Sequence, residues 1–306
     1  MPRFRRDLAS LGLALLLACS PERAAAPPAA APPARSPSPS SAPATSVPPS
    51  PSRAASPPTV VAAFGDWGIE GGRADDVVRL VNGWRPLDAV LTTGDNAYGT
   101  GTRTEAARAR RFVEPLLRRR VPFYASLGNH DVVTANGAHV MRSLGIPAHW
   151  YTRVVGRIEV VVLDSNRPGD REQAAFLRRV LAAPRRAAFR VVVFHHPPTS
   201  CSLHGANRDV ERAWVALLHG RVDAVLAGHN HTYERFDVGG VPYVTTGGGG
   251  ARLYPSIPGL CNGPGRPVTV KTVYHAMRLT ATDDRLTLEA VGLDGKTFDR
   301  YDVAAG

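Results

Sequence analysis

Five short clusters of polar residues, each following an apolar β-branched run, carry most of the reactive side chains of this 306-residue chain. The clusters are Phe64–Gly68, Gly94–Gly99, Gly128–Asp131, Phe194–Pro197 and Gly228–His231. Taken singly, each has an ordinary explanation, because Gly-Asp and Gly-Asn pairs are common in turns and an isolated histidine is usually structural. Taken together, they supply Asp, Tyr, Asn and His donors without Cys, a ligand set for hard to borderline metal ions. The pattern therefore predicts one site for two metal ions.

The elements that would position this site are indicated by apolar periodicity along the rest of the chain. Strands are expected at Val60–Phe64, Ala89–Thr93, Phe123–Leu127, Ile158–Leu163, Arg190–Phe194, Ala224–Ala227 and Val241–Thr245. Helices are expected at Ala74–Asn82, Thr104–Arg119, Gln173–Ala182 and Asp209–His219. From Val268 onward the pattern predicts more strands, with turns at Asp283-Asp284 and Asp294-Gly295. This alternation predicts an α/β sandwich with helices outside, in which ligands gather at the carboxyl ends of strands.

The five clusters, in this order, resemble those of the calcineurin-type metallophosphoesterase superfamily and most closely those of purple acid phosphatases. Most of the superfamily has Asp-x-His in its first cluster, but Asp66–Gly68 lacks that histidine. Purple acid phosphatases lack it too and supply a tyrosine at the position of Tyr98. The segment Gly228–Arg235 is also similar to that family's last cluster. The resemblance covers nearly all of Thr59–Gly250 and implies a four-layer αββα sandwich of two mixed β-sheets flanked by helices.

The resemblance also implies a ligand set, carried over by matching motifs. One metal ion would be held by Asp66, Tyr98 and His231, a second by Asn129, His195 and His229, and Asp95 would bridge the two. His195 is preferred to His196 because it lies two residues before Pro197. His196 is then expected to pack beside the ligands and support them.

Tyr98 bears on the identity of the metals. A phenol, with a reference pKa near 10, is a poor ligand for a soft or weakly charged ion, so Tyr98 favours Fe(III) at the first position. The second position suits Fe(II), Zn(II) or Mn(II). Two adjacent ions can generate a hydroxide and hold the attacking and leaving oxygens of an in-line displacement.

Two further histidines are candidates for the catalytic proton transfer. His130, adjacent to Asn129, is positioned to protonate the leaving group or to bind a phosphate oxygen. His204, nine residues after His195, matches a histidine of the small purple acid phosphatases and either shares this task or is an ordinary loop histidine. The run Gly247–Gly250 is either a flexible turn or a close approach of the backbone to the metal centre.

The expected function is that of an acid phosphatase acting on phosphate monoesters, with small phosphorylated molecules as substrates. A phosphodiesterase or nucleotidase of the same superfamily and a non-catalytic, tethered metal- or phosphate-binding module are the alternatives. Every motif ligand is present, which argues against the last. Specificity is expected to depend on the loops Thr199–Asn207 and Arg252–Pro267, which carry no recognisable motif.

The composition of the N-terminal 58 residues predicts a signal for export followed by a tether. Residues 1–19 combine a basic start with the apolar run Leu8–Ala18, whose eleven residues are too short to span a bilayer. Leu16–Ser20 resembles a bacterial lipobox, so Cys19 is a candidate lipid anchor to the cell envelope, with ordinary signal cleavage and secretion as the alternative. Residues 20–58 are mostly Pro, Ala and Ser and predict a disordered, semi-rigid stalk. The catalytic domain is expected at 59–306.

The net charge bears on the expected binding partners, and the cysteine content bears on an expected disulfide. The formal net charge is +11, of which about +7 remains from Thr59 onward, and nearly all basic groups are arginines. No continuous basic stripe with interleaved aromatic residues occurs, so no nucleic-acid partner is expected, and the charge suits attraction of small phosphorylated anions. Cys201 and Cys261 form an even pair in a protein expected to be exported, which predicts a disulfide between them, with two free thiols as the alternative.

Overall fold

The computed structural model describes residues 56–306. The predicted signal segment 1–19 with Cys19, and nearly all of the predicted stalk at 20–58, lie outside the described residues. Within residues 56–306, no helix combines the length and the apolar character that crossing a bilayer requires.

The first β-sheet has six strands in the order β13-β12-β11-β1-β2-β3. Their bounds are β1 Thr59–Phe64, β2 Ala89–Thr92, β3 Phe123–Ala125, β11 His275–Ala281, β12 Arg285–Gly292 and β13 Thr297–Ala304. Strands β1, β2 and β3 run parallel. Beyond β1, the strands β11, β12 and β13 follow in that order, and each pairs antiparallel with the one before it. The carboxyl ends of β1, β2 and β3 therefore share one edge of this sheet.

The second sheet has seven strands in the order β10-β8-β9-β7-β6-β5-β4. Their bounds are β4 Tyr151–Val155, β5 Ile158–Val162, β6 Phe189–Val193, β7 Ala224–Ala227, β8 Tyr233–Val238, β9 Val241–Thr246 and β10 Arg266–Lys271. Strands β5, β6, β7 and β9 are parallel, and β4, β8 and β10 pair antiparallel with their neighbours. Both sheets are thus mixed.

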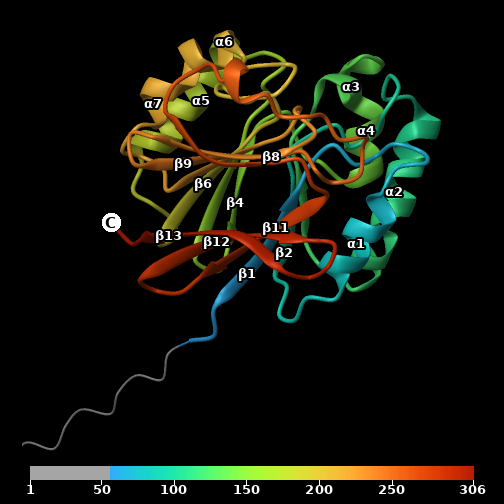
Figure 1. Cartoon of the computed structure of the whole chain (residues 1–306), viewed down its shortest axis with the longest axis horizontal. Coiled ribbons are helices and arrows are strands. Elements are labelled where there is room, and N and C mark those ends of the chain that lie inside the picture. The colour runs from blue at the N-terminus through green and yellow to red at the C-terminus, as the bar shows by residue number, and fades with distance from the viewer. Residues whose placement is uncertain (1–55) are drawn as a thin grey trace, which may run out of the picture. The chain divides into compact units, whose positions relative to one another are not determined.

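Helices cover the outer faces of the two sheets (Figure 1). Beside the first sheet lie α1 Ala74–Asn82, α2 Arg103–Arg118, α3 Asn129–Val132 and α4 Ala138–Leu144; beside the second lie α5 Arg171–Ala182, α6 Arg208–Val210 and α7 Ala216–Leu218. Alternation along β5 separates the two faces of its sheet: Val160 joins the core shared by both sheets, whereas Val161 packs with Leu177 of α5 and with Trp214. These layers confirm the expected αββα sandwich.

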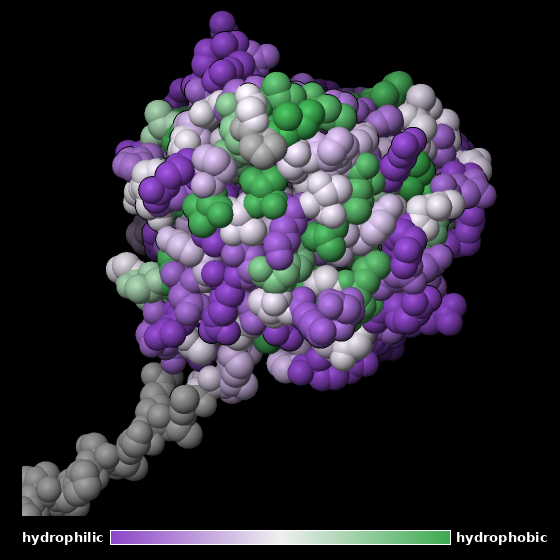
Figure 2. Space-filling model, in the orientation of Figure 1, coloured by the Kyte–Doolittle hydropathy of each residue, from purple (hydrophilic) through white to green (hydrophobic). Residues whose placement is uncertain are grey.

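The outer surface is mixed in character. Hydrophilic and hydrophobic residues are interspersed over the face of the domain that Figure 2 shows. Large exposed hydrophobic side chains among the described residues are Val133, Val154, Leu203, Ile257, Leu260 and Val268.

The predicted elements are largely confirmed, with some differences. Strands β4 and β8 and the short helices α3 and α4 were not expected. The helix expected at Asp209–His219 is divided into α6, a π-helical segment at Glu211–Val215 and α7. Strand β8 is hard to recognise because Glu234 and Arg235 interrupt its apolar pattern. Both are nevertheless buried, since the peptide N–H of Cys201 bonds to the Glu234 carboxylate and Asp299 pairs with Arg235.

Candidate metal centre

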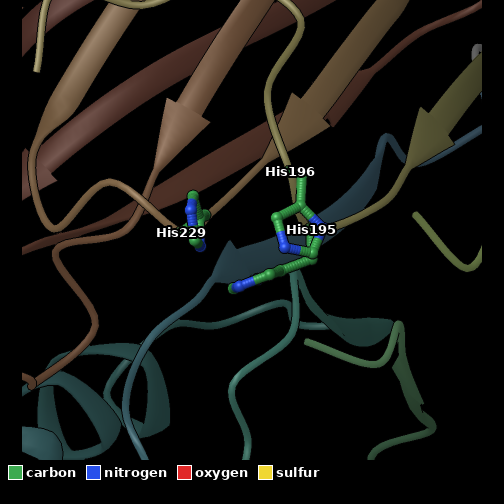
Figure 3. Close-up of side chains that lie close together, drawn as sticks. All are labelled: His195, His196 and His229. Atoms are coloured by element: carbon green, nitrogen blue, oxygen red, sulfur yellow. The ribbon is translucent and has the colours of Figure 1, made fainter. Parts of the chain in front are cut away.

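The strand-end turns bring residues of all five clusters together between the two sheets. Three residues in these turns, Asp66, Asp95 and His229, have positive φ values of 61°, 48° and 70°. Such a backbone is uncommon for residues other than glycine, and conformations of this kind gather at functional sites because the surrounding structure must hold them in place. Figure 3 shows the rings of His195 and His229 close together at the ends of their strands.

One group of donors consists of Asp66, Tyr98 and His231. The Tyr98 hydroxyl lies 2.7 Å from Nε2 of His231 and 3.4 Å from Oδ1 of Asp66. The same Oδ1 lies 3.5 Å from Nε2 of His231. All three side chains are buried. The geometry brings these residues of three different clusters to one point.

A second group consists of Asn129, His195 and His229. Oδ1 of Asn129 lies 3.0 Å from Nε2 of His195 and 3.0 Å from Nδ1 of His229. Oδ2 of Asp95 lies 3.4 Å from Nε2 of His195, and donor atoms of Asp66, Asp95 and His195 all lie within 4.8 Å of one another. Asp95 is therefore situated between the two groups.

Hydrogen bonds at the far side of two imidazole rings set their orientation. Nδ1 of His195 donates to the carbonyl oxygen of Thr93 at 2.8 Å, and Nδ1 of His231 donates to that of Arg252 at 2.7 Å. A carbonyl oxygen can only accept, so in each neutral ring Nδ1 carries the hydrogen and Nε2 keeps a lone pair. Both Nε2 atoms face the other donors, an arrangement typical of metal-binding histidines.

The local electrostatics favour positive charge on the two histidines beside Asp95 and Asp66, whereas burial and the neighbouring charge of His195 lower the pKa of His229. Burial alone would lower the pKa of His195, but Asp95 outweighs burial and raises it to about 9. Burial would likewise lower the pKa of His231, but the hydrogen bond to Asp66 and the charge of Asp66 act against burial, and the pKa is raised. Burial, followed by the charge of Asp66, raises the pKa of the Tyr98 phenol well above 10. A buried carboxylate pair that holds positive charge this strongly is suited to a cation.

His196, His130 and His204 lie around these two groups. Nδ1 of His196 lies 2.9 Å from the Ser165 hydroxyl, and a ring nitrogen of His196 lies within 4.8 Å of those of His195 and His229. The His130 ring is half-buried 4.6 Å from that of Tyr98. The exposed His204 ring lies 4.6 Å from the His229 ring. The structure thus gathers every side chain that the sequence analysis proposed for metal binding or proton transfer.

Glycines allow the turns to approach one another closely. A β-carbon on Gly228 would lie 2.6 Å from Oδ2 of Asp66, and one on Gly247 would lie 2.9 Å from the same atom. Such distances require something to move, so a larger residue at either position would displace Asp66. Of the two interpretations of Gly247–Gly250, the close approach fits this geometry.

Asp131 is the first organising residue whose role the sequence analysis missed, although it lies within the third cluster. Its buried carboxylate accepts from the peptide N–H groups of Asn96, Ala97 and Gly128 at 2.8–3.1 Å. It therefore ties the second cluster to the third. Since Asp-containing turns are common, its identity alone did not reveal this.

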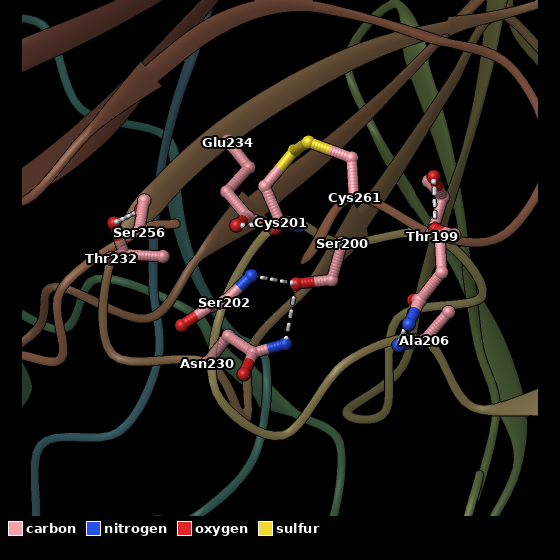
Figure 4. Close-up of a disulfide and its surroundings, with 11 residues drawn as sticks. Thr199, Ser200, Cys201, Ser202, Ala206, Asn230, Thr232, Glu234, Ser256 and Cys261 are labelled. Atoms are coloured by element: carbon pink, nitrogen blue, oxygen red, sulfur yellow. Dashed lines mark hydrogen bonds between the residues drawn. A yellow bond between two sulfur atoms is a disulfide. The ribbon is translucent and has the colours of Figure 1, made fainter. Parts of the chain in front are cut away.

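A sixth polar segment, Asp164–Asn166, follows β5 and was also missed. The Ser165 hydroxyl accepts from the peptide N–H groups of His195 and His196 at 3.1 and 2.8 Å. The segment directly follows the predicted strand Ile158–Leu163, which is the signal that could have found it. The predicted disulfide between Cys201 and Cys261 is present beside the site (Figure 4).

Comparison with known proteins shows which family the chain belongs to. The calcineurin-like phosphoesterase family matches residues 59–233. The chain is similar to tartrate-resistant acid phosphatase type 5 of Homo sapiens, at 30% identity over 66% of this chain and 76% of the human protein. It is also similar to purple acid phosphatase 4 of Arabidopsis thaliana, at 24% identity over 61% of this chain and 66% of the plant protein.

Solved structures share the fold. A purple acid phosphatase from yellow lupin seeds superposes with a TM-score of 0.67 at 19% identity, covering 81% of this chain and 54% of that one. GAP50, described as the anchor in the inner membrane complex of Plasmodium, superposes with a TM-score of 0.69 at 14% identity, covering 82% and 90%. The chain spans about half the length of the lupin protein. On the family match and the human relative, the chain belongs to the calcineurin-like phosphoesterases, among the purple acid phosphatases, and is a phosphoric ester hydrolase.

Proposed function

We propose that this protein is a dinuclear-metal acid phosphatase that hydrolyses phosphate monoesters. The observation that carries the proposal is the presence of two groups of three donors with one carboxylate, Asp95, between them. Buried acceptors that converge in this way need a positive partner, because unpaired buried charge is costly. The nitrogen and oxygen donor set, without thiolate, suits hard to borderline metal ions.

In this proposal Asp66, Tyr98 and His231 hold one ion, Asn129, His195 and His229 hold the other, and Asp95 bridges them. Tyr98 favours Fe(III) at the first position, because burial and Asp66 oppose ionisation of its phenol and only a strongly polarising cation would reverse that. The second position suits Fe(II), Zn(II) or Mn(II). When bound, the two ions would supply the nucleophile and neutralise phosphate charge.

His130 is proposed to move the proton that the leaving oxygen needs. Its Nδ1 donates to the carbonyl oxygen of Gly99 at 2.9 Å, which directs Nε2 away from that carbonyl. In the cationic ring, Nε2–H is then free to donate to a leaving oxygen or to a phosphate oxygen. His204 is proposed as a second contributor, because its ring lies beside that of His229.

Colour and metal analysis test the proposal most directly. Pure protein should be pink or purple, with a broad visible tyrosinate–Fe(III) band and two metal ions per chain by elemental analysis. Colourless protein with two zinc or manganese ions would overturn the iron assignment. Turnover of p-nitrophenyl phosphate should exceed that of its bis-ester, and the reverse order would favour the phosphodiesterase alternative.

Replacement of His130 tests its role separately. His130→Ala should lower turnover by about 10²-fold or more, the contribution typical of a positioned acid, while both metal ions remain bound. His219→Ala, at an exposed histidine outside the site, is the matched control. Unchanged turnover in His130→Ala with full metal content would remove His130 from the mechanism.

Export is proposed as well, with Cys19 as a lipid anchor. The disulfide supports an oxidising compartment, because disulfides persist mainly in exported proteins. Labelling of full-length protein with a radioactive fatty acid, compared with Cys19→Ser, tests the anchor. Equal labelling of the two proteins would contradict it.

A further inference from the structure

Two loops beside the metal centre form one unit, which we call the stapled loops: Thr199–Asn207 and Arg252–Pro267. The disulfide joins them, and the peptide groups of Ser200 and Asn262 exchange hydrogen bonds of 3.0 and 2.8 Å. The peptide N–H of Ile257 also donates to the carbonyl of Cys201 at 2.8 Å. Figure 4 shows the disulfide with its buried polar surroundings. Because the crosslink and the backbone bonds coincide, the loops should keep one fixed arrangement.

Asn230 connects the stapled loops to the metal centre. It lies between His229 and His231, and its Nδ2 donates to the Ser200 hydroxyl at 2.9 Å. Its Oδ1 accepts from the peptide N–H of His204 at 3.3 Å. The second loop is attached too, since the peptide N–H of Tyr254 donates to the carbonyl of His231 at 3.0 Å. The loops are therefore positioned directly by the turn that carries two proposed ligands.

Tyr254 is the side chain that this arrangement presents to the site. Its ring stacks on His231 with centroids 4.1 Å apart and an interplanar angle of 14°. The ring of His204 lies 5.1 Å away, edge to face. Among the described residues, the Tyr254 hydroxyl has no hydrogen-bond partner. Tyr254 thus forms an aromatic wall next to the donors, with a polar tip available to a ligand.

The stapled loops expose several large apolar side chains. Of the six large exposed hydrophobic side chains among the described residues, three lie on the stapled loops: Leu203 is 54% exposed, Ile257 37% and Leu260 47%. Leu203 is adjacent to His204 in the chain, and the backbone of Ile257 bonds to that of Cys201. Exposed apolar groups on loops that border a polar site are typical of ligand-binding surfaces.

We propose that the stapled loops form a leaving-group subsite for phosphate monoesters of apolar alcohols, with Tyr254 as its specificity-determining residue. The inference rests on the proposed phosphatase function and adds the substrate class. The phosphoryl group would lie at the two donor groups, and the apolar part of the ester would lie against Tyr254, Leu203 and Ile257. Polar leaving groups gain nothing from this contact, because they remain better solvated in water.

Two alkyl esters test the subsite, since their leaving groups differ in polarity and little in basicity. Values of kcat and KM would be measured on metal-loaded, full-length protein with hexyl phosphate and with glycerol 3-phosphate. Wild-type protein should prefer hexyl phosphate in kcat/KM. Tyr254→Ser should reduce that preference about two- to tenfold, mainly through a higher KM for the hexyl ester, as expected when apolar contact in a pocket is lost.

Further variants distinguish the contribution of the Tyr254 ring from that of its hydroxyl, and an effect on the subsite from an effect on the metal centre. Tyr254→Phe should keep the preference, and Leu203→Ser should reduce it in the same direction by a smaller factor. Val268→Ser is the matched control, because Val268 is 48% exposed on β10, outside the stapled loops. Inhibition by inorganic phosphate should be equal in wild-type protein and Leu203→Ser, since phosphate lacks a leaving group.

The outcomes distinguish this inference from the function on which it rests. If wild-type protein hydrolyses neither ester and does not hydrolyse p-nitrophenyl phosphate, the phosphatase proposal fails. If it hydrolyses p-nitrophenyl phosphate but neither alkyl ester, only the subsite is overturned. If it hydrolyses both and the Tyr254→Ser and Leu203→Ser variants change both substrates equally, only the subsite is overturned. If Tyr254→Ser loses its metal ions, the test rests on Leu203→Ser with its full metal content. An unchanged preference for hexyl phosphate in that variant overturns the subsite.

Discussion

The two sides of the candidate site are built differently. The side formed by strand-end turns, which we call the floor, carries Asp66, Asp95 and His195, and these are at most 2% exposed. The other side is the stapled loops, whose Leu203 is 54% exposed and whose Tyr254 is half-buried. Buried strands hold the floor, whereas one disulfide and a few hydrogen bonds hold the loops. On the proposed function, reactivity would depend on the sheets and selectivity on the loops.

The division has a physical reason. Donors for metal ions must lie within a few tenths of an ångström of their proper positions, and short turns after buried strands provide that accuracy. Contacts to a leaving group tolerate larger displacements, because apolar burial is not directional. The loops should therefore tolerate substitutions that the floor does not.

The largest expected effect comes from the floor. Asp95→Asn keeps an oxygen that can accept from the His130 peptide N–H but removes the charge between the two donor groups. Turnover should fall by about 10³-fold or more, and fewer than two metal ions should remain per chain. Elemental analysis and phosphate release measure both effects, with Asp209→Asn at an exposed position as the control. Normal turnover with two bound ions would show that the floor does not need this charge.

Removal of the crosslink should affect stability while sparing the floor. Cys201→Ser combined with Cys261→Ser opens a loop of 60 residues, and the free energy of unfolding should fall by about 4 kcal/mol in the chain-entropy model. The free energy of unfolding is measured by urea denaturation of the double variant, and wild-type protein with and without a reductant is the matched comparison. Metal content should stay at two ions per chain. Loss of both ions in the double variant would mean that loops and floor are one unit.

Glu234 gives a pH-dependent test of the support beneath the stapled loops. Burial raises its pKa to about 7, against partial opposition from Ser200 and the peptide N–H of Cys201. Between the ordinary value of 4.5 and about pH 7, the folded state binds a proton that the unfolded state has released. The stabilisation is thus complete below about pH 4.5 and is lost as the pH rises through about 7.

Glu234→Gln should remove this dependence, which amounts to roughly 3 kcal/mol for a shift of this size. Urea midpoints at pH 5 and pH 8 should differ less in the variant than in wild-type protein. Glu172→Gln, at an exposed glutamate, should behave like the wild type. Parallel pH profiles for Glu234→Gln and wild type would show that the buried carboxyl is already ionised.

The smallest expected effect concerns Ser165, which supports the floor from behind. Ser165→Ala removes the acceptor for the peptide N–H groups of His195 and His196. Metal affinity should weaken about 10- to 100-fold, as is usual when a group that orients a ligand is lost. Ser143→Ala is a suitable control, since that hydroxyl bonds to a carbonyl on α2. Equal metal dissociation constants for Ser165→Ala and wild type would contradict the role.

Much of the floor could be predicted because its information is local. Each cluster couples a buried β-strand to a tight turn, and Asp66 and His195 lie in turns directly after the expected strands. Parallel strands bring such turns to one edge, so convergence follows from the fold class. Ser165 escaped notice because Ser and Asn after a strand also suit an ordinary turn. Glu234 escaped notice because its burial depends on a peptide N–H that lies 33 residues away in the chain.

The sequence alone predicted the fold class and the pair of cysteines, because period-two patterns and cysteine counts are readable within short windows. It also offered the candidate donor residues, through the resemblance of its five clusters to a known family. Only the tertiary structure decided that Tyr254 stacks on His231 and that Asn230 anchors the loop of His204. Both relations join segments more than twenty residues apart, in loops without periodicity. Their geometry follows from the crosslink and from packing of the whole domain, which no short stretch of residues encodes.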